Sequence, residues 1–214
     1  MSAASVGNFS IWLLIAVLSV GVGGYALYLT VTGFEHLGLT NPMLDPWGLQ
    51  AHIAASGVAM LLGAFQFSKT LRRKAPTVHR WAGYGYVIAC VVGGFAGGAI
   101  AMSSTAGPIA GFGFFTLAFL WVPFTLLALA AAMRKDFVAH ERWMIRSFAL
   151  TFGAVTLRIY LPIAIIMNQG EFPLDAYRAI AWLAWVPNLI VAELFILTLR
   201  KPRRPKAAAA PTTA

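Results

Sequence analysis

The sequence predicts an all-α integral membrane protein, a helical bundle with six transmembrane helices. Charged residues make up only 11% of the 214 residues and hydrophobic residues 59%, whereas a soluble domain carries about 25% charged residues. The mean hydropathy is +0.75, and the apolar residues gather in long runs. A chain so poor in charge cannot cover a water-facing surface, so we expect lipid to be the solvent for most of it.

Six apolar windows are each long enough to cross a bilayer. A spanning helix needs about 20 mostly apolar residues, because the hydrocarbon core is about 30 Å thick and each residue rises about 1.5 Å. The windows lie near residues 9–33, 47–68, 80–103, 108–133, 142–167 and 178–199. None shows the polar face that a helix of a soluble protein needs. We therefore predict a single six-helix transmembrane domain over residues 1–199.

The basic residues alternate between loops and so predict a topology. Fourteen of the 16 lysines and arginines lie in segments 69–80, 134–146 and 200–206. Loops with such an excess stay in the cytoplasm, which predicts a multi-pass protein of the bacterial cytoplasmic (inner) membrane with both termini inside. Residues 200–214 are predicted to be a disordered basic tail that attracts anionic lipid. The net charge of +9 does not indicate nucleic acid, because the basic residues occur in short bursts beside apolar runs.

Small residues and prolines predict how the helices pack. Glycines four apart allow helix backbones to approach closely in lipid, and such pairs are Gly93–Gly97, Gly94–Gly98 and Gly107–Gly111. We interpret them as contacts within the bundle; a cofactor slot or a dimer face is the alternative. Prolines kink helices, and three lie inside the spans: Pro123, Pro162 and Pro187. The lone Cys90 is interpreted as a small buried residue.

The four histidines are the first candidates for chemistry. His36 and His52 fall at the outer ends of the first two spans, and His79 and His140 fall at the inner ends of the third and fifth. Two neutral imidazoles that face each other at equal depth can bind a haem iron from both sides. A pair near each membrane face would carry electrons across the bilayer, as in cytochromes of the b561 type, which use other ligand spacings. The alternative is that these histidines are interfacial anchors.

Each inner histidine belongs to a short motif with an arginine and a tryptophan, His79-Arg80-Trp81 and His140-Glu141-Arg142-Trp143. Arg80 and Arg142 can neutralise a haem propionate. The competing interpretation is that both arginines reach to lipid phosphate. Three or four histidines cannot converge on one zinc ion, because the two pairs are a membrane apart.

Charged residues inside the spans are the second set of candidates, because such groups are costly in lipid. Arg146 in the fifth span matches the depth of Glu193 in the sixth, which predicts a structural ion pair. Arg158 lies about 13 Å from the outer end of the fifth span, without an acidic partner. A quinone carbonyl, a haem propionate, or backbone carbonyls freed by Pro162 are its predicted partners, and the three alternatives stay open.

The inner motifs resemble a known family. The runs that carry the resemblance are Thr77-Val78-His79-Arg80-Trp81-Ala82-Gly83-Tyr84-Gly85-Tyr86 and His140-Glu141-Arg142-Trp143-Met144-Ile145-Arg146-Ser147-Phe148-Ala149-Leu150-Thr151. They are similar to the prokaryotic domain of unknown function 2306, a family of predicted multi-pass membrane proteins, over about His52 to Pro162. The resemblance implies a membrane fold and no established activity. Its characteristic positions are His52, His79, Arg80, His140, Arg146 and Arg158; His36 lies outside the pattern.

Three functions remain open from the sequence. The first is a b-type haem protein in electron transfer or quinone-linked chemistry, with a quinone or redox partner. The second is a transporter or proton-coupled carrier in which Arg158, Glu193 and Asn188 line a polar path. The third is a non-catalytic accessory or assembly protein. Neither a phosphate-binding GxxxxGK[ST] loop nor an HExxH zinc motif occurs in the chain, and both are signatures of other enzyme classes.

Overall fold

The computed structural model describes residues 3–33 and 46–199, with the backbone alone for residues 3–9. His36 and the predicted tail, residues 200–214, lie outside the described residues. Within them the chain is helical and has no strand. The helices are α1 (Ala3–Thr32), α2 (Pro46–Gln66), α3 (Lys69–Lys74), α4 (Pro76–Ala101), α5 (Pro108–Met133), α6 (Phe137–Thr151), α7 (Gly153–Met167), α8 (Leu174–Leu183) and α9 (Val186–Leu199).

All six predicted spans are present. Six helical stretches are long and apolar enough to cross a membrane: Ser10–Thr32, Pro46–Gln66, Pro76–Ala101, Pro108–Met133, Phe137–Met167 and Leu174–Leu199. The third and fifth begin earlier than the hydropathy indicated. Pro76 starts α4, where its missing N–H costs nothing, and the Asp136 side chain caps α6 by accepting from the Ala139 N–H at 3.0 Å. His79 and His140 therefore lie in the first turn of a helix and not before it.

The fifth and sixth spans are each built from two helices. The sixth is interrupted at Ala184 and Trp185, and Pro187 follows in the first turn of α9, as expected for a residue without a backbone donor. The fifth is interrupted at Phe152, well before Pro162. Pro123 lies inside α5 and Pro162 inside α7, and neither proline ends its helix. The two interruptions touch, since a Cβ placed on Gly153 would lie 3.3 Å from the Ala184 carbonyl oxygen.

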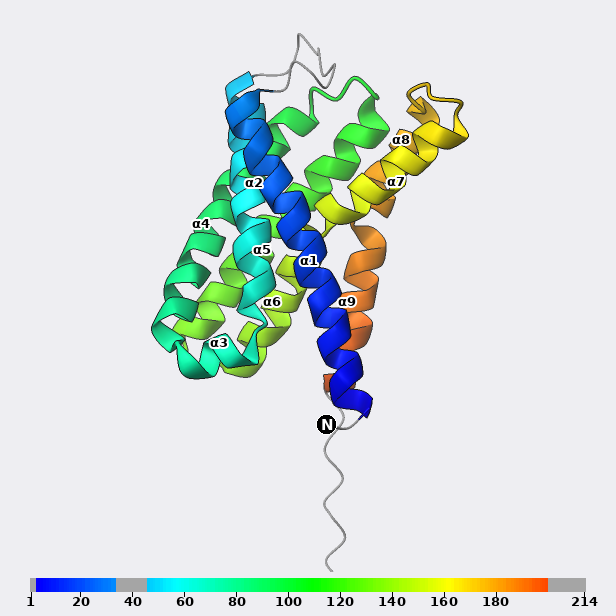
Figure 1. Ribbon diagram of the computed structural model, residues 1–214. Coiled ribbons are helices and arrows are strands. Elements are labelled where there is room, and N and C mark those ends of the chain that lie inside the picture. The colour runs from blue at the N-terminus through cyan, green and yellow to red at the C-terminus, as the bar shows by residue number, and fades with distance from the viewer. Residues whose placement is uncertain (1–2, 34–45, 200–214) are drawn as a thin grey trace, which may run out of the picture.

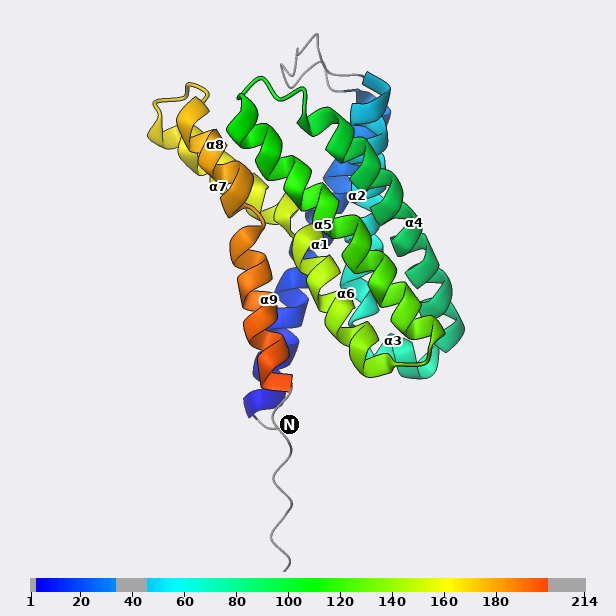
Figure 2. The same ribbon diagram turned by 180° about the vertical axis from the view of Figure 1, so that it is seen from behind.

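Four helices form the core of the bundle. α2 packs against α4, α4 against α5, α5 against α6, and α6 against α2, so α4 and α6 face each other diagonally. α1 lies outside this ring against α2 and α7, while α8 packs on α5 and α9 on α6. Figures 1 and 2 show α7 and α8 leaning away from the four-helix core at the end opposite α3.

The glycine pairs of α4 contact two different neighbours. A Cβ on Gly93 would lie 3.2 Å from Ser56 Oγ of α2, and one on Gly97 would lie 2.6 Å from His52 Nδ1 of the same helix. Gly94 instead faces Val122 of α5, which a Cβ would overlap. The interpretation of these pairs as contacts within the bundle is confirmed.

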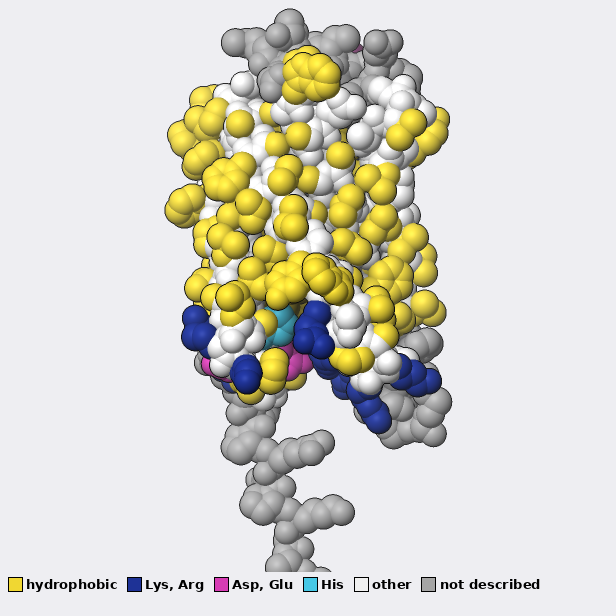
Figure 3. Space-filling model, turned by 90° about the vertical axis from the view of Figure 1, so that its left-hand side faces the viewer, with side chains coloured by type: hydrophobic (Ala, Val, Ile, Leu, Met, Phe, Trp, Pro, Cys, Tyr) yellow, Lys and Arg dark blue, Asp and Glu magenta, His cyan; other side chains and the backbone are white. Residues whose placement is uncertain are grey.

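The outer wall of the bundle is apolar. Large hydrophobic side chains point outward along the spans, among them Val31 at 88% and Phe95 at 70% exposure. Figure 3 shows a hydrophobic wall with the lysine and arginine side chains gathered at one end, which we call the basic end. α3, with Lys69, Arg72, Arg73 and Lys74, lies there. A surface of this kind is stable in lipid and not in water.

Candidate functional site

His79 and His140 face each other across the core at the basic end. On α4, His79 and Tyr86 share a helix face because they are seven residues apart, and on α6 the same holds for His140 and Ser147. Tyr86 meets Ser147 directly, with 2.8 Å between their oxygens. Two turns toward the basic end, the same two faces carry the histidines, and His140 is near enough for its charge to act on His79. The two histidines therefore lie on facing sides of α4 and α6 at the basic end, and their pairing around a ligand stays a prediction.

The hydrogen bond of His140 fixes its tautomer. Its Nδ1 lies 2.8 Å from the Ala128 carbonyl oxygen. A carbonyl only accepts, so Nδ1 carries the proton and Nε2 keeps its lone pair. Histidines that ligate a metal are commonly oriented by a bond of this kind from the other ring nitrogen.

Two buried polar nitrogens at this end lack a partner among the described residues, His79 Nδ1 and Gln66 Nε2. The side chain of Gln66 reaches Gly83, where a Cβ would lie 3.5 Å from its Oε1. Gly83 is one turn beyond His79 on α4, so both nitrogens lie at the same level of the core. Buried polar atoms are rarely left unpaired. One such nitrogen in the histidine pair and a second on the nearby Gln66 indicate a place for a bound group.

The arginines around this pair differ from the expectation. Arg80 is exposed and Arg142 is half-buried. Neither arginine forms a hydrogen bond with His79 or His140 among the described residues. The exposed Arg72 of α3 is instead near enough for its charge to act on His79. The sequence identified the loop as basic but could not select Arg72, because the short helix α3, capped by Ser68, determines where each basic side chain of the loop lies.

A buried hydroxyl cluster fills the core next to the histidine pair. Besides Ser147, the Tyr86 oxygen contacts Thr151 Oγ1 at 2.9 Å, and Thr151 accepts from Trp121 Nε1 at 2.8 Å. Thr125 Oγ1 lies 2.6 Å from Ser147 Oγ. Sequence analysis missed this cluster. The available signal was the four-residue spacing of Ser147 and Thr151, which places two hydroxyls on one face of α6.

Arg146 and Glu193 form the predicted ion pair. Arg146 Nε and Nη2 donate to the two carboxylate oxygens of Glu193 at 2.5 and 2.8 Å. The guanidinium also lies over the Trp143 ring, 4.7 Å from its centre. The bidentate geometry satisfies both charges in the inner half of the bundle.

His52 and Arg158 lie in the other half of the bundle. His52 Nδ1 is 2.8 Å from the Gly93 carbonyl oxygen, and its ring rests on Gly97. Arg158 belongs to α7, and its charge acts on His52. Its Nη1 donates to the Ala154 carbonyl at 3.1 Å. That carbonyl precedes Arg158 in α7, so it is not the one that Pro162 leaves without a donor. His36, the predicted partner of His52, is not among the described residues.

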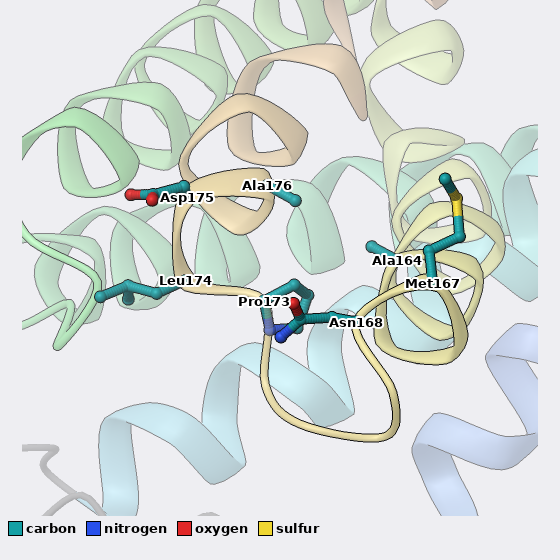
Figure 4. Close-up of a pocket in the computed structure, with 7 residues that line it drawn as sticks. All are labelled: Ala164, Met167, Asn168, Pro173, Leu174, Asp175 and Ala176. Atoms are coloured by element: carbon teal, nitrogen blue, oxygen red, sulfur yellow. The ribbon is translucent and has the colours of Figure 1, made fainter.

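The other features of the described chain are weaker candidates for a functional site. No cluster of three or more histidine, cysteine or acidic side chains suited to a metal ion occurs within residues 3–33 and 46–199. A shallow pocket lies where α7 and α8 meet, lined by Ala164, Met167, Asn168, Pro173, Leu174, Asp175 and Ala176. In Figure 4 its polar side chains, Asn168 and Asp175, do not point toward one another. Asp175 is paired with Arg178 at 2.7 Å.

Fold and composition together define a polytopic helical membrane protein. The model of the family described as predicted membrane protein (DUF2306) matches residues 49–196, more than half of the chain, and the protein belongs to this family. Neither the curated proteins nor the solved structures contain a significant match. The matched range includes His52, His79, His140 and Arg158, and it leaves His36 outside.

Proposed function

We propose that this protein is a b-type haem protein of the bacterial cytoplasmic membrane that takes part in electron transfer. His79 and His140 would hold the haem iron at the basic end, between the diagonal helices α4 and α6. The observation that supports the proposal is the position of the two histidines on facing sides of α4 and α6, two turns from the Tyr86–Ser147 contact, with unpartnered buried nitrogens on His79 and on Gln66. Bis-histidine ligation by facing helices suits a haem that exchanges single electrons.

The contacts of the individual residues support separate roles in binding a haem. His140 has its Nδ1 proton on the Ala128 carbonyl, which leaves Nε2 as a ligand of fixed direction. His79 faces it from α4. Arg72, whose charge acts on His79, would offer positive charge for a propionate, with Arg80 and Arg142 as the further candidates that the motifs suggested. The basic end then faces the cytoplasm, as the distribution of lysine and arginine favours.

Two observations weigh against the transport alternative. Glu193, the acidic group that a proton path would use, is neutralised by two hydrogen bonds from Arg146. The side-chain amide of Asn188 donates to Thr156 Oγ1 at 2.9 Å and to the Ala184 carbonyl at 3.0 Å. Both side chains therefore act as structural groups where the two interrupted spans meet. A second haem at the outer face would need His36, so the proposal is limited to the inner pair.

The absorption spectrum of the purified protein tests the haem proposal. Protein produced with added 5-aminolevulinate should show a Soret band that shifts on reduction with dithionite. The variants His79→Ala and His140→Ala should each lose most of this band. His52→Ala is the matched control and should keep it. A folded wild-type protein without haem, or a Soret band that survives in both inner variants, would rule the site out and favour the accessory role.

A further inference from the structure

The short helix α3 at the basic end is held in place between the spans α2 and α4, which it contacts. Ser68 caps it, with 3.2 Å between the Leu71 backbone nitrogen and Ser68 Oγ. Phe67, just before the cap, packs on Phe148 with ring centres 5.3 Å apart. At the other end the Ala75 N–H donates to the Leu71 carbonyl at 2.9 Å. The backbone that carries the basic side chains of α3 is therefore fixed to the bundle.

A pocket lined by cations lies along one side of α3. Lys69, Thr70, Arg73 and Lys74 surround a cavity of about 280 Å³. Lys69 is four residues from Arg73, and Thr70 is four residues from Lys74, which places the four on adjacent rows of one helix face. All four residues are exposed. Three positive groups and one hydroxyl thus share one open space, and no acidic residue among those described lines it.

The three cations of this pocket have no ion pair within the described residues. Glu193 is paired with Arg146 there, and Asp136 caps α6 by accepting from a backbone N–H. Positive groups that lie close together repel one another. An anion that accepts hydrogen bonds from several of them relieves this repulsion, and such charge-assisted bonds are the strong ones.

The pocket lies at the level of lipid headgroups. α2 ends at Gln66 and α4 begins at Pro76, so α3 lies immediately beyond the apolar part of two spans. In the first turns of α4, Trp81 is 71% exposed, and its ring centre is 5.9 Å from that of Tyr84. Tryptophan and tyrosine gather where the hydrocarbon meets the headgroups. On the face that Figure 3 shows, the basic side chains directly border the hydrophobic wall.

We propose that Lys69, Thr70, Arg73 and Lys74 bind the phosphodiester headgroup of an anionic lipid of the phosphatidylglycerol class. The phosphate oxygens accept hydrogen bonds from Arg73, the two lysines and the Thr70 hydroxyl. The acyl chains lie along the hydrophobic wall. A zwitterionic lipid has the same phosphate but carries its own positive charge, so the net negative charge selects the ligand. The site does not depend on the haem.

Lipid binding by the purified full-length protein in dodecyl maltoside tests this site. Native mass spectrometry counts bound dioleoylphosphatidylglycerol, and dioleoylphosphatidylcholine is the zwitterionic comparison. Wild-type protein should retain the anionic lipid at concentrations where the zwitterionic one has dissociated. Arg73→Gln/Lys74→Gln should weaken binding of the anionic lipid about 30-fold, because each cation near a membrane surface contributes about fivefold in affinity.

A variant with the same loss of charge at the same end is the control. Arg134→Gln/Lys135→Gln removes two exposed cations that do not line the pocket. It should bind the anionic lipid within about threefold of wild type, because salt screens charges that do not touch the headgroup. Arg73→Lys keeps the charge and should retain most of the affinity. Melting temperatures without lipid show that each variant is folded.

Inorganic phosphate distinguishes a lipid headgroup from a soluble anion. Millimolar phosphate should not displace the lipid, because phosphate has no acyl chain to hold it at the membrane. Displacement by phosphate that binds wild type and not Arg73→Gln/Lys74→Gln would show a soluble-anion site and overturn the proposal. Equal weakening in the two double variants, or equal binding of the two lipids, would overturn it as well.

Discussion

Two arginines of the fifth span show how differently one membrane protein treats the same side chain. Arg146 sits in the inner half, held by both oxygens of Glu193 and by the face of Trp143. Arg158 sits in the outer half, and its hydrogen bond within the described residues goes to a carbonyl of its own helix. The first guanidinium has a carboxylate partner among the described residues. The second has none there, and a charged group of that kind inside a span is a candidate for a functional role.

The largest expected effect on stability comes from breaking the ion pair between Arg146 and Glu193. Glu193→Leu leaves the guanidinium of Arg146 without its carboxylate. Removing one partner of a buried pair costs about 3–5 kcal/mol, and because the Glu193 side chain is 44% exposed we expect the lower end of that range, about 3 kcal/mol. We expect a correspondingly large loss in the free energy of unfolding, measured by denaturant titration in mixed micelles. The double variant Arg146→Met/Glu193→Leu removes both charges and should recover most of that loss. If the single variant is as stable as wild type, the ion pair is not structural.

A smaller effect is expected where the helices approach most closely. Gly97→Ala places a Cβ 2.6 Å from His52 Nδ1, and overpacking of this kind costs about 1–3 kcal/mol. The substitution should lower the melting temperature, because the imidazole of His52 must move. Gly24→Ala is the matched control, since its Cβ meets nothing within 4 Å, and it should not reduce stability. Equal behaviour of the two variants would contradict the packing of His52 on α4.

The smallest effect on stability is expected at Arg158. Arg158→Gln removes a charge that no described carboxylate balances, so the unfolding free energy should change by less than about 1 kcal/mol, in either direction. Circular dichroism melts of wild type and variant measure this directly. A loss as large as that in Glu193→Leu would show that Arg158 is structural, and the contrast between the two arginines would disappear.

Some of the site follows from spacing and depth alone. The pairing of Arg146 with Glu193 could be predicted because both residues lie at similar distances from the inner ends of their spans. Unpaired charges are costly in lipid, so opposite charges at equal depth are expected to pair. The facing of His79 and His140 was a hypothesis of the same kind. The hydroxyl cluster around Tyr86 could not be predicted, because it joins three helices. Hydropathy does not determine how each helix is rotated about its own axis.

The neighbourhood of Arg158 shows the same limit. Depth indicated an arginine without an acidic partner, and it also offered carbonyls near Pro162 as acceptors. The structure places its hydrogen bond on Ala154 instead. The surroundings of Arg158 depend on α1 packing against α7 and on the interruption at Phe152, after which α7 leans away from the core.

The amino-acid sequence by itself determined the solvent, the number of spans and the sites of glycine-mediated packing. Each of these is a local property: a run of apolar residues, or a spacing of four between small ones, has the same meaning wherever the helix lies. The tertiary structure alone decided that α4 and α6 are diagonal, that a cluster of hydroxyl groups surrounds Tyr86, and that Arg158 donates to the Ala154 carbonyl. These depend on how helices are arranged around one another, and in lipid that arrangement is set by shape and hydrogen bonds between distant segments.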